Sequence, residues 1–348
     1  MSLRPPNSTR SRRNGRRLLV SLAALIGAAA VAPSALAAGA SFALRPVTFD
    51  PKVPATASYF IFPAKKGKTI TSEVRVTNAG DQAGTAYLYP VDATTGQTSG
   101  TVYLARAKAR RDVGRWLRVA APSVVLAPGE SKIVSFRLTI PRGARPGEHV
   151  GGIVAENARL KTGAKAQGSK GRGGFQISIR ELTIVGVEVQ LPGGKPKLNV
   201  SHVKAGGQTG NQAILLGLKN TGGLLLKPHG RVRVKDSHGR TLKARALSLD
   251  TLIPATKIDY PVYFPGKPLR PARYKVTIDL AYAGKKLHVT KTLDISKKNV
   301  TQVFGSRSRA VIGGGGNTML PWLLMGIALL VATGAVGIML RSRRIATR

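Results

Sequence analysis

Apolar and polar residues alternate along most of the chain between residues 40 and 295, with a period of two residues and not the 3.6 of a helix. The clearest run is 274–282, in which large apolar residues alternate with lysine, threonine, aspartate and alanine. Similar runs occupy 70–76, 134–140 and 231–235. Strict alternation is typical of strands with one buried and one solvent-exposed face. The sequence therefore predicts an all-β fold for this region.

The chain also contains a repeated pattern of strands and turns. An alternating segment that ends in Asn-x-Gly occurs at 74–80 and again at 216–222, and a Leu-x-Pro motif follows each copy, at 126–128 and 252–254. Asparagine and glycine tolerate the left-handed conformation best, so each Asn-x-Gly is expected to form a left-handed turn between strands. Two copies of one such unit predict two tandem immunoglobulin-like β-sandwiches.

The predicted domain limits follow from these repeats and from changes in composition. The first sandwich is placed at 38–192 and the second at 195–295, on either side of a Leu-Pro-Gly-Gly boundary. Residues 159–174 are rich in glycine and lysine and contain no acid, which predicts a mobile loop. Residues 296–318, which include four consecutive glycines, are predicted to form a flexible stalk.

The N-terminus has the pattern of a secretory signal. Six arginines precede an apolar run at 18–32, and Ala35-Leu36-Ala37 offers the small residues of a cleavage site. Residues 1–37 are therefore predicted to be a signal peptide that is cut after Ala37. An uncleaved signal anchor is the alternative.

The C-terminus has the pattern of a membrane anchor. Residues 319–340 form an uncharged run of 22 residues, and a helix needs about 20 residues to cross the hydrocarbon core. Four arginines follow in 341–348, and such basic segments stay in the cytoplasm. The sequence thus predicts a single-pass protein of the cell membrane, with a transmembrane helix at 319–340, a cytoplasmic tail at 341–348 and both sandwiches outside the cell.

Composition narrows the class of protein further. The chain contains no cysteine, so its exported domains depend on apolar cores and not on disulfides, which suits a bacterial surface. Without the basic residues of the leader and the tail, 45 lysines and arginines remain against 15 acids, a net charge of +30. Such a charge attracts anionic partners. Because the predicted topology excludes nucleic acid, wall polymers and anionic lipid headgroups are the better candidates; a merely solvated basic surface is the alternative.

The sequence contains no recognisable catalytic or metal-binding constellation. The five histidines are isolated, none has the spacing of a zinc site, and no Gly-x-Ser-x-Gly motif occurs. Glu148 and His149 would point to opposite faces of a strand, so they would not serve one substrate. We therefore predict a non-enzymatic protein with no catalytic residues, no metal and no cofactor.

The most suggestive binding segment is 106–118, which is rich in arginine and holds one of the two tryptophans. Arginine binds phosphate and carboxylate in bidentate fashion, and a tryptophan face stacks on sugars or guanidinium groups. The alternative is that Trp116 and Leu117 close the end of the sandwich beside a solvated loop. The candidate ligand-binding residues are Arg106, Lys108, Arg110, Arg111, Arg115, Trp116 and Arg118.

Several motifs occur in the order seen in a known family. They are Phe42-Ala43-Leu44-Arg45-Pro46, Tyr59-Phe60, Val76-Thr77-Asn78, Trp116-Leu117, Leu126-Ala127-Pro128-Gly129-Glu130, Ile140-Pro141, Pro146-Gly147 and Gly151-Gly152-Ile153. From residue 42 to about 190 the chain resembles the N-terminal, peptidoglycan-binding domain of the WxL-interacting proteins, which are bacterial surface proteins. The resemblance implies that the first domain contacts peptidoglycan, that the second engages partner or host proteins, and that neither is catalytic.

Together, the sequence and the resemblance predict a membrane-anchored cell-surface protein of a Gram-positive bacterium. It would bind peptidoglycan or another anionic wall polymer and scaffold other secreted surface proteins. One alternative is a membrane-tethered assembly chaperone for fibre or surface subunits, because two-domain sandwiches can pair a strand edge with such subunits. A glycosidase accessory or unrecognised hydrolase is a third class.

Overall fold

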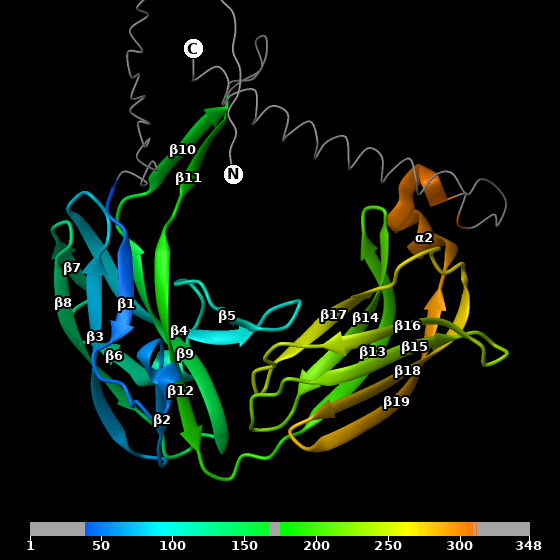
Figure 1. The fold of residues 1–348 in the computed structure, drawn as a ribbon, viewed down its shortest axis with the longest axis horizontal. Helices are drawn as coiled ribbons and strands as arrows, with labels where there is room; N and C mark the ends of the chain where they lie inside the picture. The colour runs from blue at the N-terminus through cyan, green and yellow to red at the C-terminus, as the bar shows by residue number, and fades with distance from the viewer. Residues whose placement is uncertain (1–38, 167–174, 309–310, 312–348) are drawn as a thin grey trace, which may run out of the picture. The chain divides into compact units, whose positions relative to one another are not determined.

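The structure is a computed structural model that describes residues 39–166, 175–308 and 311 (Figure 1). Most of these residues lie in strands that form sandwich-like sheets, so the prediction of a β fold is confirmed. The predicted signal peptide, transmembrane helix and cytoplasmic tail lie outside the described residues. Within the described part of the chain, no helix combines the length and the apolar character needed to cross a membrane.

The N-terminal sandwich, defined here as residues 42–191, contains two facing sheets, a separate two-stranded hairpin within 161–179 and the short helix α1 (Val113–Trp116). One sheet has the strand order β1-β3-β8-β6, and the other has the order β2-β12-β9-β4-β5, with β7 also paired to β4. Neighbours are antiparallel except for β2 and β12. The strands are β1 (Phe42–Pro46), β2 (Phe60–Pro63), β3 (Thr69–Asn78), β4 (Gly84–Thr95), β5 (Thr101–Tyr103), β6 (Leu117–Val119), β7 (Ser123–Leu126), β8 (Ser131–Thr139), β9 (Gly147–Asn157) and β12 (Leu182–Leu191).

The core of the N-terminal sandwich lies between these two sheets. On β3 and β8, alternate residues such as Val76 and Phe136 are buried in it, while their neighbours Arg75 and Arg137 are exposed. Full burial of a side chain of this size contributes about 1.5–3 kcal/mol. The two-residue alternation therefore fixes which face of each strand is buried, and it leaves arginines on the outer face of the β1-β3-β8-β6 sheet.

The C-terminal sandwich, defined here as residues 198–295, has one sheet of order β13-β14-β17 and a second of order β16-β15-β18-β19. All of its strand pairs are antiparallel, and a separate apolar cluster fills the space between the sheets. The strands are β13 (Leu198–Gln208), β14 (Asn211–Asn220), β15 (His229–Lys235), β16 (Thr241–Ser248), β17 (Lys257–Tyr263), β18 (Ala272–Tyr282) and β19 (Lys285–Ile295).

The sequence repeat corresponds to a repeated hydrogen-bond arrangement around two buried asparagines. Asn78 Nδ2 donates to the carbonyls of Gln82 (2.7 Å) and Leu126 (3.1 Å). Asn220 Nδ2 donates to the carbonyls of Leu224 and Leu252, both at 2.8 Å. In each copy, one side-chain amide therefore binds two backbone carbonyls: the one four residues ahead and that of the leucine in the Leu-x-Pro motif. The side-chain oxygen then accepts from the N–H two residues ahead, at 3.0 Å in both cases.

The prediction of left-handed Asn-x-Gly turns is wrong. Neither the two asparagines nor Gly80 and Gly222 have a positive φ. The glycines are needed for a different reason: a Cβ would lie 2.1 Å from the Gly39 carbonyl oxygen at Gly80, and 2.4 Å from the Lys197 nitrogen at Gly222. These motifs therefore hold neighbouring segments together through a buried amide and a close backbone approach.

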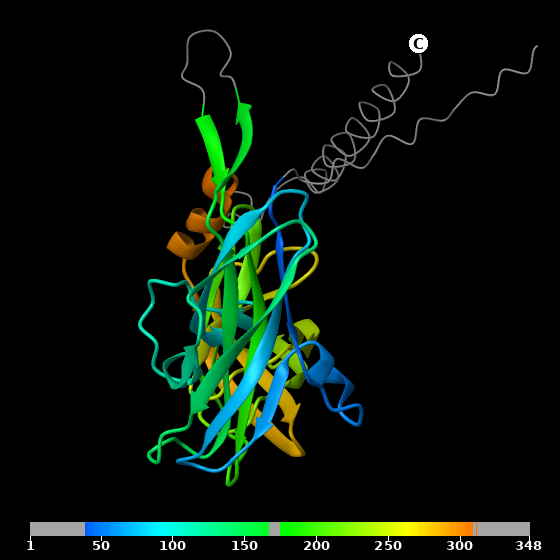
Figure 2. The ribbon, with the colours of Figure 1, turned by 90° about the vertical axis from the view of Figure 1, so that its left-hand side faces the viewer.

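The prediction of a loop at 159–174 is only partly correct. Strand β10 (Lys161–Ala166) pairs with β11 (Phe175–Ile179) in an antiparallel ladder that is irregular between Thr162 and Lys165. This hairpin is drawn in green in Figure 2. Backbone pairing needs no apolar side chains, so a ladder can form in a segment whose composition indicates a loop. Residues 167–174 lie outside the described residues.

The prediction of a stalk that starts at residue 296 is also wrong. Helix α2 (Lys297–Phe304) follows β19 directly, with a capping box between Ser296 and Asn299. Val300 and Val303 are buried, and Val311 packs against the core of the C-terminal sandwich. The chain therefore leaves this sandwich later than its composition suggested, because Val300 belongs to the core and Phe304 packs against it.

Candidate functional site

An open hollow, which we call the arginine hollow, lies at one end of the N-terminal sandwich, beside α1 and the ends of β6 and β8. Its volume is about 510 Å³. Arg111, Arg115 and Arg118 contribute three guanidinium groups from one short stretch of chain. The other lining residues are Trp116, Thr139 and Pro141. The hollow thus combines cations, a hydroxyl group and a small apolar surface.

The guanidinium groups of Arg111 and Arg115 are available for a ligand. Both side chains are exposed, and no described residue forms a hydrogen bond or ion pair with either group. The Arg118 guanidinium donates to the carbonyls of Arg115 and Leu117, each at 2.9 Å, and these two bonds fix its orientation. One oriented and two uncompensated guanidinium groups suit a carboxylate or phosphate, which they can bind in bidentate fashion.

A buried carboxylate holds the backbone that carries these arginines. Asp92, on β4, is 6% exposed. Its oxygens accept from the backbone N–H groups of Arg111, Asp112 (3.1 Å) and Gly114 (2.6 Å). A Cβ at Gly114 would lie 2.6 Å from the Val91 carbonyl carbon, so only glycine allows α1 to approach β4 this closely.

Aromatic side chains fix the segment that precedes α1. Tyr103, on β5, covers a pair of glycines on adjacent strands: a Cβ at Gly152 or Gly186 would lie within 3 Å of its ring carbon or hydroxyl oxygen. Burial raises the pKa of Tyr103 above its ordinary value. The Arg106 guanidinium lies 4.8 Å from the ring centre of Tyr89 and 5.5 Å from that of Tyr87. The segment between β5 and α1 is therefore pinned near its start and at its end.

Trp116 serves mainly as part of the core. It is 7% exposed, and the next residue, Leu117, is fully buried in the same cluster. The Trp116 ring packs against the imidazole of His149 with 4.6 Å between ring centres. A tryptophan this deeply buried cannot offer a whole face to a sugar, so recognition in the hollow falls chiefly to the arginines.

His149 and its neighbours support the base of the hollow. Its Nδ1 lies 2.6 Å from Asp112 Oδ1, and its Nε2 donates to the Arg145 carbonyl at 2.9 Å. Glu148 points the other way, and its carboxylate accepts from the N–H of Leu225. The prediction that Glu148 and His149 face opposite sides of β9 is therefore confirmed. Burial raises the pKa of the Glu148 carboxyl and lowers the pKa of Arg145, which Asp112 partly restores.

The structure brings together four of the seven residues that the sequence singled out. Arg111, Arg115, Trp116 and Arg118 line the hollow. Arg106 is stacked on tyrosines, and Lys108 and Arg110 are exposed on the preceding loop, outside the hollow's lining.

Three residues of the site come from β8 and its end and were missed. Thr139 and Pro141 line the hollow, and Arg137 lies directly opposite Arg118 in the β6–β8 register. Like charges in directly opposed positions destabilise a sheet, and no described residue pairs with the Arg137 guanidinium. The alternation on β8 places Arg137 and Thr139 outward, but only strand pairing shows that they lie beside Arg118.

Replacing Asp92 by asparagine should lower the free energy of unfolding of the N-terminal sandwich by about 2–3 kcal/mol, because an amide NH2 would face backbone donors and a charge-assisted bond would be lost. Urea unfolding followed by Trp116 fluorescence in a Trp322→Phe background measures this. The matched control is Asp50→Asn, at an exposed carboxylate, which should stay within about 0.5 kcal/mol of the parent. Equal effects of the two substitutions would contradict the role given to Asp92.

The described residues contain no group of three or more histidine, aspartate or glutamate side chains placed to hold a metal ion. In the hollow itself, the lining offers cations and one hydroxyl but no carboxylate or imidazole. The side chains that surround it can therefore bind an anion, and they include neither a general base nor an adjacent nucleophile–base pair.

Comparison with solved structures finds chaperones of bacterial fimbriae. One is described as a chaperone–tip adhesin complex of CFA/I fimbriae biogenesis (16% identity, TM-score 0.36, covering 72% of this chain and 98% of that chain). Another is the class 5 fimbriae chaperone CfaA (17%, 0.35, 72% and 99%). A third is the CsuC–CsuE pre-assembly complex of Acinetobacter baumannii (12%, 0.32, 73% and 100%). At this level of similarity we draw no functional conclusion from them.

No curated protein matches the chain. A family profile does match it: that of the WxL Interacting Protein, peptidoglycan binding domain, over residues 42–157. The matched stretch runs from β1 to the end of β9, so it includes every residue that lines the hollow. It confirms the resemblance seen in the sequence motifs. Residues 42–157, about a third of the chain, are therefore similar to the WxL Interacting Protein peptidoglycan-binding domains.

Proposed function

We propose that the N-terminal sandwich holds anionic cell-wall polymer in the arginine hollow. The match to a peptidoglycan-binding family supports a role at the cell surface, in contact with the cell wall. The observation that carries the proposal is the pair of exposed guanidinium groups, Arg111 and Arg115, without partners in the described part of the chain and beside the oriented Arg118. Peptidoglycan stem peptides offer carboxylates and wall polymers offer phosphates, and arginine binds both. The protein acts as a binding module and not as an enzyme.

The wall-binding domain is proposed to sit on a single-pass membrane protein with both sandwiches outside the cell. The support comes from sequence: the secretory pattern at 1–37, the uncharged run at 319–340 and the arginines of 341–348. Protease treatment of wall-stripped cells tests this orientation. Digestion of both sandwiches is expected, and their digestion only in inside-out vesicles would contradict it.

The C-terminal sandwich, as a second immunoglobulin-like domain, is proposed to scaffold other secreted surface proteins. Its strand β16 pairs with β15 on one side only, and Leu242 on it is 44% exposed. An open strand edge can accept a strand from another protein. A photo-crosslinking residue at Leu242 should yield adducts with secreted proteins on intact cells. Absence of adducts both at Leu242 and on β17, an edge strand of the other sheet, would contradict this role.

Wall binding should weaken as salt is added. The Debye length falls from about 10 Å at 0.1 M to about 3 Å at 1 M ionic strength. Because the hollow offers charge and little apolar surface, its attraction for an anionic polymer should weaken accordingly. The binding affinity, measured by sedimentation of the full chain with purified sacculi in mild detergent, is expected to fall at least about tenfold over that range. Equal binding at both salt concentrations would show that charge is not the basis of recognition.

A further inference from the structure

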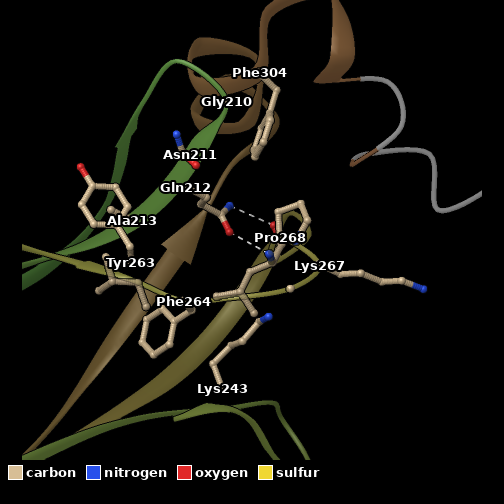
Figure 3. Close-up of a pocket in the computed structure, with 13 residues that line it drawn as sticks. Gly210, Asn211, Gln212, Ala213, Lys243, Tyr263, Phe264, Lys267, Pro268 and Phe304 are labelled. Atoms are coloured by element: carbon tan, nitrogen blue, oxygen red, sulfur yellow. Dashed lines mark hydrogen bonds between the residues drawn. The ribbon is translucent and has the colours of Figure 1, made fainter. Parts of the chain in front are cut away.

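A second hollow, which we call the lysine hollow, opens at the end of the C-terminal sandwich where the chain leaves it. Figure 3 shows side chains that converge on it from β14, from the loop after β17, from β16 and from α2. Its volume is about 110 Å³. Because one buried water needs about 10–15 Å³ of such space, the hollow has room for several waters or for a phosphate group. Its apolar lining residues include Phe264, Pro268 and Phe304.

The walls of this hollow are fixed by hydrogen bonds. The Gln212 amide donates to the Leu269 carbonyl (3.0 Å) and accepts from the Leu269 N–H (2.7 Å), which ties β14 to the 264–269 loop (Figure 3). The Gly210 N–H donates to the Val303 carbonyl at 2.8 Å, which ties the β13–β14 turn to α2. The hollow is therefore formed before any ligand arrives, and binding requires little ordering.

The charge of the hollow is positive. Lys243 Nζ donates to the Pro265 carbonyl at 2.7 Å, which leaves two of its three protons for a ligand. Lys267 is exposed at the rim, and none of the described lining residues is acidic. Burial lowers the pKa of Lys243 below its ordinary value, and a bound anion would offset that cost.

Further cations lie on α2 and just beyond it. Lys297, Lys298 and Arg307 are exposed, and no described residue forms an ion pair with them. Asp294, the last acid before α2, is bound by Arg273 at 2.8 Å. The uncompensated charge at this end of the sandwich is thus basic, which suits an anionic surface.

Chain length limits how far this end can lie from the predicted membrane span. Val311 packs against the core of the C-terminal sandwich, and the uncharged run begins at Met319. Eight residues of chain reach at most about 29 Å. The opposite end, at Lys285 and Lys286, is separated from α2 by the 11 residues of β19, which is about 37 Å of strand. The lysine hollow is therefore at the end tethered closest to the span.

We propose that this hollow docks the C-terminal sandwich on the bilayer by binding the phosphate of an anionic phospholipid headgroup between Lys243 and Lys267. The inference rests on the proposed membrane anchor, which supplies the proximity. Phe264 and Phe304 face the less polar part of the headgroup region. The bound lipid holds the sandwich against the membrane, so the N-terminal domain works at a restricted distance from it.

The test uses the full chain in nanodiscs of phosphatidylcholine alone or with phosphatidylglycerol. Hydrogen exchange of the 264–269 loop should be at least about tenfold slower with phosphatidylglycerol. The double variant Lys243→Gln/Lys267→Gln should lose this protection. The matched variant Lys285→Gln/Lys286→Gln, with the same change in charge at the far end, should retain it.

Three outcomes would overturn the proposal. Equal hydrogen exchange in the two lipids would exclude a headgroup site. Equal loss of protection in both double variants would show that the protection depends on the overall charge of the sandwich and not on this hollow. Protection by inorganic phosphate in phosphatidylcholine discs would assign the hollow to a free anion. Extraction of the chain from membranes by alkaline carbonate would instead refute the anchor itself, so the two failures are distinguishable.

Discussion

Replacing Arg111, Arg115 and Arg118 together by glutamine should weaken binding of the full chain to purified sacculi by about a hundredfold. Because these side chains are exposed, each lost ion pair costs about 1 kcal/mol. Three such losses amount to about a hundredfold, since about 1.4 kcal/mol corresponds to a factor of ten. The side chains are exposed, so the fold should persist. Sedimentation at low salt over a range of sacculus concentrations measures the change.

The control for this experiment must remove the same charge elsewhere. Lys219, Arg231 and Arg245 are exposed on strands of the C-terminal sandwich. Their combined replacement by glutamine should change wall binding by no more than about twofold, because only the long-range attraction of a screened charge is lost. If both triple variants lost binding equally, the wall would recognise net charge and not the hollow.

Replacing Asn78 by alanine should lower the free energy of unfolding of the N-terminal sandwich by about 3–5 kcal/mol. The side chain is fully buried, and its loss leaves the Gln82 and Leu126 carbonyls and the Gly80 N–H without their partner. Each unsatisfied buried group costs about 1–3 kcal/mol, and the cavity adds to this. Urea unfolding followed by Trp116 fluorescence in the Trp322→Phe background provides the measurement.

Gln82→Ala is the matched control, because the Gln82 side chain is exposed while its carbonyl still accepts from Asn78. It should stay within about 0.5 kcal/mol of the parent. Asn220→Ala should reproduce the Asn78 effect in the C-terminal sandwich, with hydrogen exchange as the readout. A loss below about 1 kcal/mol at Asn78 would mean that water replaces the amide and that the repeat is not held together by it.

The local part of the fold could be predicted from the sequence because a strand's two-residue pattern is written in consecutive residues. The alternation of Phe136 and Leu138 with Arg137 gave both the strand and its buried face correctly. The asparagine motifs were recognised as a repeat, but their geometry was not. Their partners, Leu126 and Leu252, lie far along the chain, and a turn preference does not reveal such distant acceptors.

The same distinction between local and distant contacts explains the outcome at the site. The arginines of 111–118 are visible as a cluster, whereas Arg137 and Thr139 join them only through the β6–β8 pairing. The sequence left both a ligand contact and a core position open for Trp116, since composition cannot show that its ring packs on His149. Helix α2 did carry a signal, Ser296 followed by Asn299 and then two valines, but eight residues are too few for a clear period.

The most direct test of the arginine hollow is to ask where peptidoglycan touches the chain. A photo-crosslinking residue at Thr139 lies in the lining of the hollow but leaves all three arginines intact. A second at Thr241, on the C-terminal sandwich, serves as the control. After illumination with sacculi and digestion of the glycan, muropeptide adducts are expected at position 139 and not at 241. Adducts at neither position, or equally at both, would contradict binding in the hollow.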